Sequence, residues 1–266
     1  MHNIEIKIKN NRIWRHISLA GNWLLNICWR LSSGLKATFW YVFFVNGTRN
    51  PVLMKNGLQI IHGDDHFTDF AEWLSAHIPD QVIETAIKKM EGEPASDSSS
   101  ASFSTDIVKL LDEDTKLEIL RFALDDKNIC MACGYLRFVP KLTTISILLN
   151  RSSEENPVGS QRWHRDWFNH KGVNIFTAIT EINEDRGMYS AIGLTAIPRY
   201  SEIPVYYKPS DVHIYDRDRV SDDLMRQYVT NDNVQNLKGP PGTTALVDSG
   251  WVYHKGGFLK DGYRIM

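Results

Sequence analysis

The sequence pattern changes after Asp126, and this change most constrains how the chain can fold. Before it, apolar residues between Asp69 and Met90 recur at spacings of three and four, as they do on one face of an α-helix. Pro79 predicts a break in that helix, because proline removes a backbone donor. We expect Thr105-Asp106 to cap a second helix that extends to Phe122. Residues 1–126 are therefore predicted to form a mainly helical portion.

After Asp126 the chain is rich in β-branched residues and is punctuated by Gly, Pro and Asp turns. An α+β chain is expected from helices that precede a run of strands, and residues 127–266 are predicted to form a sandwich or barrel. A further strand is expected near the N-terminus, where Ile4 to Ile8 alternates apolar and polar residues. The strands expected in the second part cover Tyr135–Val139, Leu142–Leu149, Val173–Ile182, Ile203–Tyr207 and Thr243–Val247.

The sequence also predicts the structure of two further segments. Residues 92–104 are rich in Ser and are expected to form a mobile surface loop. Tyr263 to Met266 resembles the opening of a strand at the point where the chain stops, and we expect a C-terminally truncated chain.

Composition excludes several classes of protein. A formal net charge of −2 over 266 residues gives no reason to expect a nucleic-acid partner. The apolar stretch 13–31 is interrupted by charged and polar residues, and 38–45 is too short to span a bilayer. The three cysteines, Cys28, Cys130 and Cys133, cannot form a disulfide framework, and two or three of them are expected to be buried thiols. We therefore expect a cytoplasmic protein.

Residues 13–45 combine basic and aromatic side chains. Such a segment suits a peripheral contact with a membrane or a protein partner. The alternative interpretation is that these aromatic residues pack a core or a dimer contact. If residues 13–45 make a peripheral contact, the protein could be membrane-associated. It could also be a catalytically silent β-helix protein that acts by recruiting partners.

The segment Trp163-His164-Arg165-Asp166 carries the strongest chemical signal. On a strand, residues two apart point to the same face, so His164 and Asp166 would lie a few ångström apart. His254, expected to follow a strand, can supply a third ligand. Two histidines and one carboxylate form the facial triad of non-haem iron enzymes, which leaves coordination positions open for a keto-acid and dioxygen.

Arg264 follows His254 across a turn and a short strand. 2-Oxoglutarate has a distal carboxylate that needs a buried cation, and a bidentate guanidinium suits it best. The pair predicts Fe(II) with 2-oxoglutarate and O2 as cosubstrates. A cupin-like metal enzyme that works without a keto-acid remains the alternative, and such an enzyme would not need Arg264.

The stretch from Gly159 to Asp166, with Glu184-Asp185-Arg186-Gly187, and the stretch from Gly242 through His254 to Arg264, resemble the phytanoyl-CoA dioxygenase family. The resemblance covers roughly Leu142 to Met266. It implies a double-stranded β-helix (jelly-roll or cupin-like) core with iron on His164, Asp166 and His254, and with 2-oxoglutarate on Arg264. Asn150 resembles a family position that touches the keto-acid.

The resemblance also implies the reaction. In halogenating relatives a small residue replaces the carboxylate, so the intact Asp166 favours hydroxylation of an unactivated C–H bond, with release of succinate and CO2. The substrate is expected to be a small molecule or a lipid-like acyl compound. Met188 to Gly193 and Gly256 depart from the family pattern on the substrate side.

Further side chains near the motif have two interpretations each. Trp163 and Trp167 flank the ligands, so one either lines the pocket or packs beneath the sheet. His170 either touches substrate or is a solvated loop histidine. His62 and His66 lack a third ligand and are expected in a turn before a helix.

Overall fold

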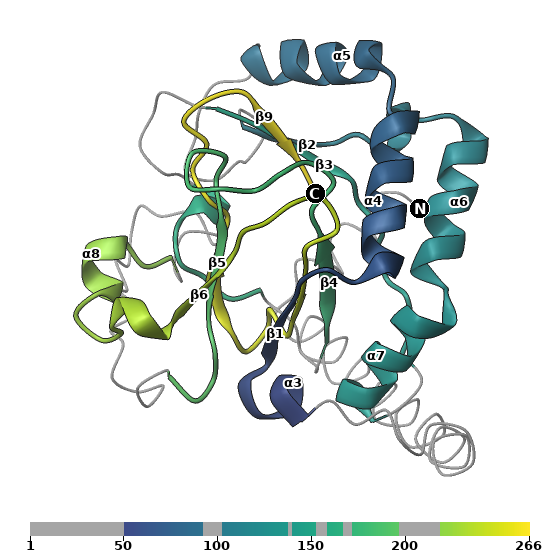
Figure 1. Cartoon of the computed structure of the whole chain (residues 1–266). Coiled ribbons are helices and arrows are strands. Elements are labelled where there is room, and N and C mark those ends of the chain that lie inside the picture. Colours follow the sequence, from purple (N-terminus) through teal and green to yellow (C-terminus); the bar gives the residue numbers. More distant parts are fainter. Residues whose placement is uncertain (1–50, 93–102, 138–139, 153–158, 167–171, 197–218) are drawn as a thin grey trace, which may run out of the picture. The chain divides into compact units, whose positions relative to one another are not determined.

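The computed structural model describes residues 51–92, 103–137, 140–152, 159–166, 172–196 and 219–266. The chain divides into two compact units, residues 1–49 with 129–141, and residues 50–128 with 142–266. Every strand of the described ranges belongs to the second unit (Figure 1). No helix within these ranges is long and apolar enough to cross a membrane. The segments 4–8, 13–45, 93–102 and 203–207, to which the sequence assigned roles, lie outside the described residues.

Helices dominate the described ranges before Leu136. Their bounds are α3 Pro51–Asn56, α4 Asp65–His77, α5 Asp80–Glu91, α6 Glu113–Ala123 and α7 Asp126–Leu136. A short helix, α8, follows later in the chain at Asp222–Met225, and 3-10 turns lie at Val108–Leu110, Gly159–Gln161 and Asn231–Asn233. The break expected at Pro79 is confirmed, because α4 ends in an extended Ile78 and α5 begins after the proline. The turn expected before a helix is confirmed at His62, since Asp64 caps α4, whereas His66 lies in the first turn of that helix.

The predicted start of the second helix was wrong. Thr105 and Asp106 lie in strand β2 (Ser104–Asp106), whose backbone pairs with β3 (Leu148–Arg151). Helix α6 instead begins after Asp112, whose carboxylate accepts a hydrogen bond of 2.8 Å from the backbone N–H of Thr115. Pairing with the distant strand β3 therefore decided the conformation of this segment, although Ser, Thr and Asp are all common at helix caps.

The strand predicted at Tyr135–Val139 was wrong, because Tyr135 and Leu136 end helix α7, while residues 138–139 lie outside the described ranges. The strand predicted at 142–149 was wrong in its bounds, since only its end joins a strand, in β3. The stretch 173–182 contains β4 (Asn174–Thr177), and 243–247 contains β7 (Thr244–Val247), as expected.

Strands form three antiparallel three-stranded sheets. Their orders are β1-β7-β4, β2-β3-β9 and β6-β5-β8, where the remaining strands are β1 Leu58–Ile61, β5 Tyr189–Ile192, β6 Val234–Leu237, β8 Tyr253–Lys255 and β9 Tyr263–Ile265. Backbone hydrogen bonds from Ile179 and Thr180 to Ile265 continue β4 onto β9 and so connect the first two sheets. The third sheet is extended by the pairing of His164 with His254.

The sheet β6-β5-β8 packs against the sheet that contains β4 and β7. One apolar cluster contains residues from both sheets. Ala245 and Val247 of β7, with Ala178 just after β4, lie in it together with Tyr189 and Ala191 of β5. We call the space between these sheets the interior. Because side chains alternate along a strand, the neighbouring Ile192 lies in a different cluster on the reverse face.

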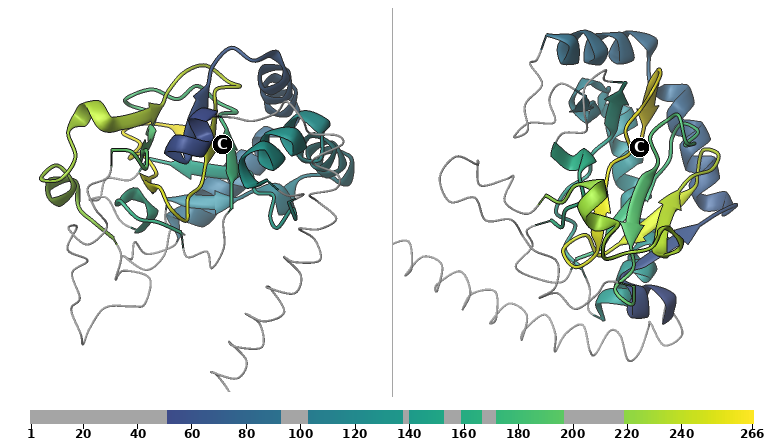
Figure 2. Two further views of the ribbon diagram at one scale, coloured as in Figure 1. Left: turned by 90° about the horizontal axis from the view of Figure 1, so that it is seen from below. Right: turned by 90° about the vertical axis from the view of Figure 1, so that its left-hand side faces the viewer.

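Helices α4, α5 and α6 cover the outer face of β3 and β9 (Figures 1 and 2). Leu149 and Ile265 pack there with Leu74 and Ile119 in a cluster of buried apolar residues. Asn150 and Arg264, the next residues along the two strands, therefore face the opposite side, which is the interior. The expected α+β character with antiparallel sheets is thus confirmed.

Candidate metal centre

Three predicted ligands meet at one end of the interior. Ligand atoms of His164, Asp166 and His254 all lie within 4.8 Å of one another. Oδ1 of Asp166 is 3.8 Å from Nε2 of His164 and 3.7 Å from Nε2 of His254. Both histidines are buried and Asp166 is half-buried. The structure therefore assembles residues that the sequence separates widely.

Backbone pairing holds the triad together. His164 and His254 exchange two N–H···O=C bonds of 2.9 Å, so their side chains share a face of the sheet. That face is the interior one, because His254 also pairs with Ala191 of the interior cluster. The backbone N–H of Asp166 donates to the carbonyl oxygen of Ser249 at 2.8 Å. His254 lies within strand β8, and not after a strand as the sequence suggested.

Both imidazoles are oriented by main-chain carbonyls. Nδ1 of His164 lies 2.8 Å from the carbonyl oxygen of Arg162, and Nδ1 of His254 lies 3.1 Å from that of Val252. A carbonyl only accepts, so each Nδ1 carries the proton and each Nε2 presents a lone pair. Metal-binding histidines are commonly held in this way.

Burial keeps the imidazoles neutral. Burial, and then the charge of His254, lowers the pKa of His164 from 6.5 to about 3. Burial also lowers the pKa of His254, against the opposing effect of the Asp166 carboxylate. Neutral imidazole is the form that binds a metal, so neither side chain has to lose a proton near neutral pH.

The donor set fits a divalent transition metal. At 3.7 and 3.8 Å the Asp166 oxygen is beyond hydrogen-bonding distance of both Nε2 atoms. Such a spacing leaves room for an ion with ligand bonds of about 2 Å. Within the described ranges this is the only group of three or more His, Cys, Asp or Glu side chains with that geometry. Cys133 is buried and Cys130 half-buried, and both are free thiols outside any such group.

Arg264 is a buried cation in the same interior. Its side chain is 3% exposed, and burial lowers its pKa from 12.5 to about 10. Nη2 donates to Oδ1 of Asn150 at 2.9 Å, and Nη1 donates to the carbonyl oxygen of Gly187. Nε has no hydrogen-bond partner, and no carboxylate among the described residues forms an ion pair with this guanidinium.

An uncompensated buried guanidinium is unusual in a folded protein, because burial of a charge is costly without a counter-ion. Arg264 therefore suits an anion that enters the interior, such as a carboxylate. Asn150 contacts Arg264 directly, so its side chain orients the guanidinium.

Tyr189 was missed by the sequence analysis. Its ring lies 5.6 Å from that of His254 and 5.0 Å from that of Phe176. Burial, and then the charge of Asp166, raises the pKa of its hydroxyl well above the usual 10. No motif singled it out, because a tyrosine in a buried strand is ordinary until its neighbours are known.

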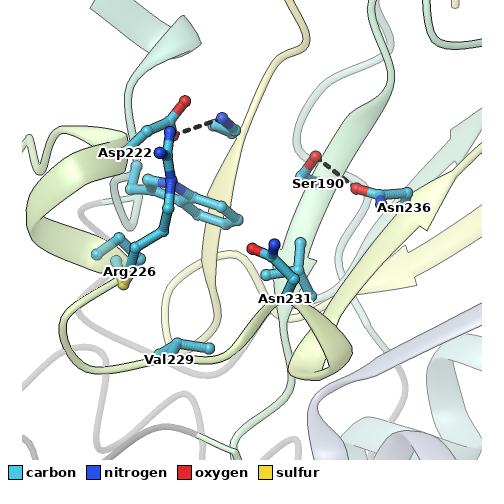
Figure 3. A pocket seen from close by; sticks show the side chains of 10 residues that line it. Ser190, Asp222, Arg226, Val229, Asn231 and Asn236 are labelled. Carbon is cyan, nitrogen blue, oxygen red and sulfur yellow. Dashed lines mark hydrogen bonds and ion pairs between the residues drawn. The ribbon is translucent and has the colours of Figure 1, made fainter.

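A cavity of about 460 Å³ lies on the reverse face of the sheet β6-β5-β8 (Figure 3). Ser190 and Lys255 line this cavity. Ser190 lies next to Ala191 and Lys255 next to His254 in the sequence, and because those two face the interior, Ser190 and Lys255 point to the reverse face. Trp163 lines this cavity too, with Nζ of Lys255 5.0 Å from its ring, so it packs beneath the sheet. Trp167 and His170 lie outside the described residues.

No protein-family model matches the chain, and no curated protein matches its sequence. Solved structures resemble it at low identity, and EctD, SnoN and HygX are three of them. EctD from S. alaskensis with 2-oxoglutarate and 5-hydroxyectoine is 12% identical over 80% of this chain and 71% of that chain, with a TM-score of 0.44. SnoN, a non-heme alpha ketoglutarate dependent epimerase from nogalamycin biosynthesis, is 12% identical over 88% and 80%, with a TM-score of 0.46.

HygX from Streptomyces hygroscopicus, with nickel, 2-oxoglutarate and hygromycin B bound, is 10% identical over 80% of this chain and 82% of that chain, with a TM-score of 0.41. At these TM-scores and identities, the likenesses support no conclusion about function.

Proposed function

We propose that this chain is an iron(II)- and 2-oxoglutarate-dependent oxygenase. The observation that carries the proposal is the triad of His164, Asp166 and His254, in which two imidazole Nε2 lone pairs and a carboxylate face one point. Two histidines and one carboxylate with open positions are typical of non-haem iron oxygenases. Structural zinc would use four protein ligands, which this group does not supply.

We further propose that 2-oxoglutarate extends from the metal to Arg264. Its distal carboxylate would pair with the guanidinium, whose charge has no acidic partner among the described residues. Asn150 and the carbonyl of Gly187 would hold the guanidinium in place. With dioxygen as co-reactant, iron and 2-oxoglutarate bound together would supply an oxidant for unactivated C–H bonds, with release of succinate and CO2.

The apolar interior would exclude water from this chemistry. Ala191, which pairs with His254, is buried in the interior cluster together with Val247 and Val252. A dry site strengthens the electrostatic interaction between Arg264 and a carboxylate. Because Asp166 supplies a carboxylate where a halogenating enzyme needs space for chloride, we propose hydroxylation of a small-molecule or lipid-like substrate.

The strand order supports a double-stranded β-helix for residues 127–266. One side of the interior is formed by β3, β4, β7 and β9, and the other by His164, β5, β6 and β8. The chain therefore passes from one side to the other several times. Such repeated crossing between two sheets is the pattern of a jelly roll. Residues 1–126 would form the helical portion, which also adds β1 and β2 to these sheets.

The test is iron-dependent formation of succinate from 2-oxoglutarate in air, measured by mass spectrometry without added primary substrate. Wild-type protein should turn over slowly in this uncoupled reaction. His164→Ala and Asp166→Ala should abolish it, whereas His62→Ala, at an exposed histidine, should not. Protein that binds iron but forms no succinate from 2-oxoglutarate, with or without Arg264→Ala, would instead indicate a metal enzyme that works without a keto-acid.

A further inference from the structure

The hydroxyl of Tyr189 has no hydrogen-bond partner among the described residues. The side chain is 4% exposed, and the oxygen atom itself is shut off from solvent. Such groups are rare, because a buried hydroxyl without a partner has lost its hydrogen bonds to water and gained none. A buried, unpartnered donor in a functional site therefore indicates a ligand that supplies the missing acceptor.

Tyr189 lies between the two ends of the proposed site. Two residues before it, the carbonyl of Gly187 contacts Arg264. Two residues after it, Ala191 pairs with the triad residue His254. Residues two apart on a strand share a face and lie about 7 Å from one another, so Tyr189 and Ala191 both face the interior.

We propose, on the basis of the proposed function, that the Tyr189 hydroxyl donates a hydrogen bond to bound 2-oxoglutarate. A five-carbon diacid held by the metal at one end and by Arg264 at the other has to pass the side chain that lies between them. Its carboxylate and keto oxygens are acceptors only, which matches a phenol that has a free proton to donate. Tyr189 is thus a positioning residue for the cosubstrate.

The test measures the affinity for 2-oxoglutarate under anaerobic conditions, with Mn(II) in place of iron, by isothermal titration calorimetry. Tyr189→Phe should weaken 2-oxoglutarate binding about tenfold or more, because it removes a hydrogen bond to a charged acceptor. Binding of Mn(II) alone should not change. Tyr263→Phe is the matched control, since Tyr263 is an exposed tyrosine next to Arg264 on β9, and its affinity should equal that of the wild type.

Thermal unfolding distinguishes a role of Tyr189 in ligand binding from a purely structural role. Phenylalanine keeps the ring contacts and removes an unpartnered hydroxyl, so metal-free Tyr189→Phe should melt no lower than wild type. The rise in Tm on addition of Mn(II) and 2-oxoglutarate should nevertheless be smaller in this variant. A lower Tm without ligand, together with an unchanged rise, would overturn the inference.

Two failures can be told apart. Wild-type protein that binds no 2-oxoglutarate in the presence of metal overturns the proposed function and this inference with it. Wild-type binding that Tyr189→Phe leaves unchanged overturns only the inference. With Fe(II), a shifted visible charge-transfer band in Tyr189→Phe would place the contact at the keto-acid end. Weaker binding with an unshifted band would place it at the distal carboxylate, and both results support the contact.

Discussion

Oδ1 of Asn150 accepts a hydrogen bond of 2.9 Å from Nη2 of Arg264, and the two residues are also direct partners in the pairing of β3 with β9. Both side chains are buried. An amide oxygen orients a guanidinium without neutralising it, because it carries no net charge. The positive charge of Arg264 is therefore left for an anion that enters the interior.

Arg264→Lys should weaken the binding of 2-oxoglutarate by about tenfold or more, since lysine keeps the charge and loses the paired donors. Arg264→Ala should weaken it further. Affinity for Mn(II) alone should remain, because Arg264 is not part of the triad. Calorimetry with each ligand checks this, with Arg226→Ala as a control at an exposed arginine. Equal losses of metal and 2-oxoglutarate binding would contradict the assignment.

Loss of any one triad side chain should remove tight metal binding. His164→Ala, Asp166→Ala and His254→Ala each delete one of three ligands, and we expect affinity to fall on the order of a hundredfold or more, beyond the loss caused by changing an outer hydrogen-bond partner. Anaerobic titration with Fe(II) and 2-oxoglutarate should give a weak visible band in wild type and none in these variants. A variant that retained the band would remove its residue from the proposed ligand set.

Metal-free protein should lose stability as the pH falls below about 6.5. The folded protein holds the pKa of His164 at about 3, whereas the unfolded chain protonates this side chain near 6.5. Between these values the unfolded state binds more protons, so the free energy of unfolding decreases with falling pH, by up to about 1.4 kcal/mol per pH unit from this group.

Urea unfolding over this pH range measures the slope. His164→Gln should flatten it, because glutamine does not titrate, whereas His62→Gln should leave it unchanged at an exposed site. Identical slopes for wild type and His164→Gln would show that this histidine is not buried in its neutral form.

Gly257→Ala should destabilise the protein by about 2 kcal/mol or more. A Cβ at Gly257 would lie 2.1 Å from the carbonyl carbon of Gly187 and 2.2 Å from the carbonyl oxygen of Met188, so backbone has to move. The same shift would displace the carbonyl that accepts from Arg264 and weaken 2-oxoglutarate binding. Gly256→Ala is the control, because its Cβ would approach nothing closer than 3.5 Å, and its Tm should stay near that of wild type.

Local chemistry predicted several features correctly. Pro79 separates α4 from α5 because proline cannot continue the hydrogen bonding of a helix, whatever surrounds it. His164 and Asp166 share a face because side chains alternate along extended backbone. The prediction from local sequence was wrong at Thr105-Asp106, because these residues pair with β3 and do not cap a helix.

The sequence by itself determined which residues can act as metal ligands, since imidazole and carboxylate chemistry belongs to the side chains. Only the tertiary structure decided that His254 joins His164, because long-range backbone pairing brings them together. It also decided that Arg264 lacks an acidic partner among the described residues and that the Tyr189 hydroxyl is unsatisfied there. Burial and hydrogen bonding of these groups depend on every strand around the interior, and no local sequence pattern records them.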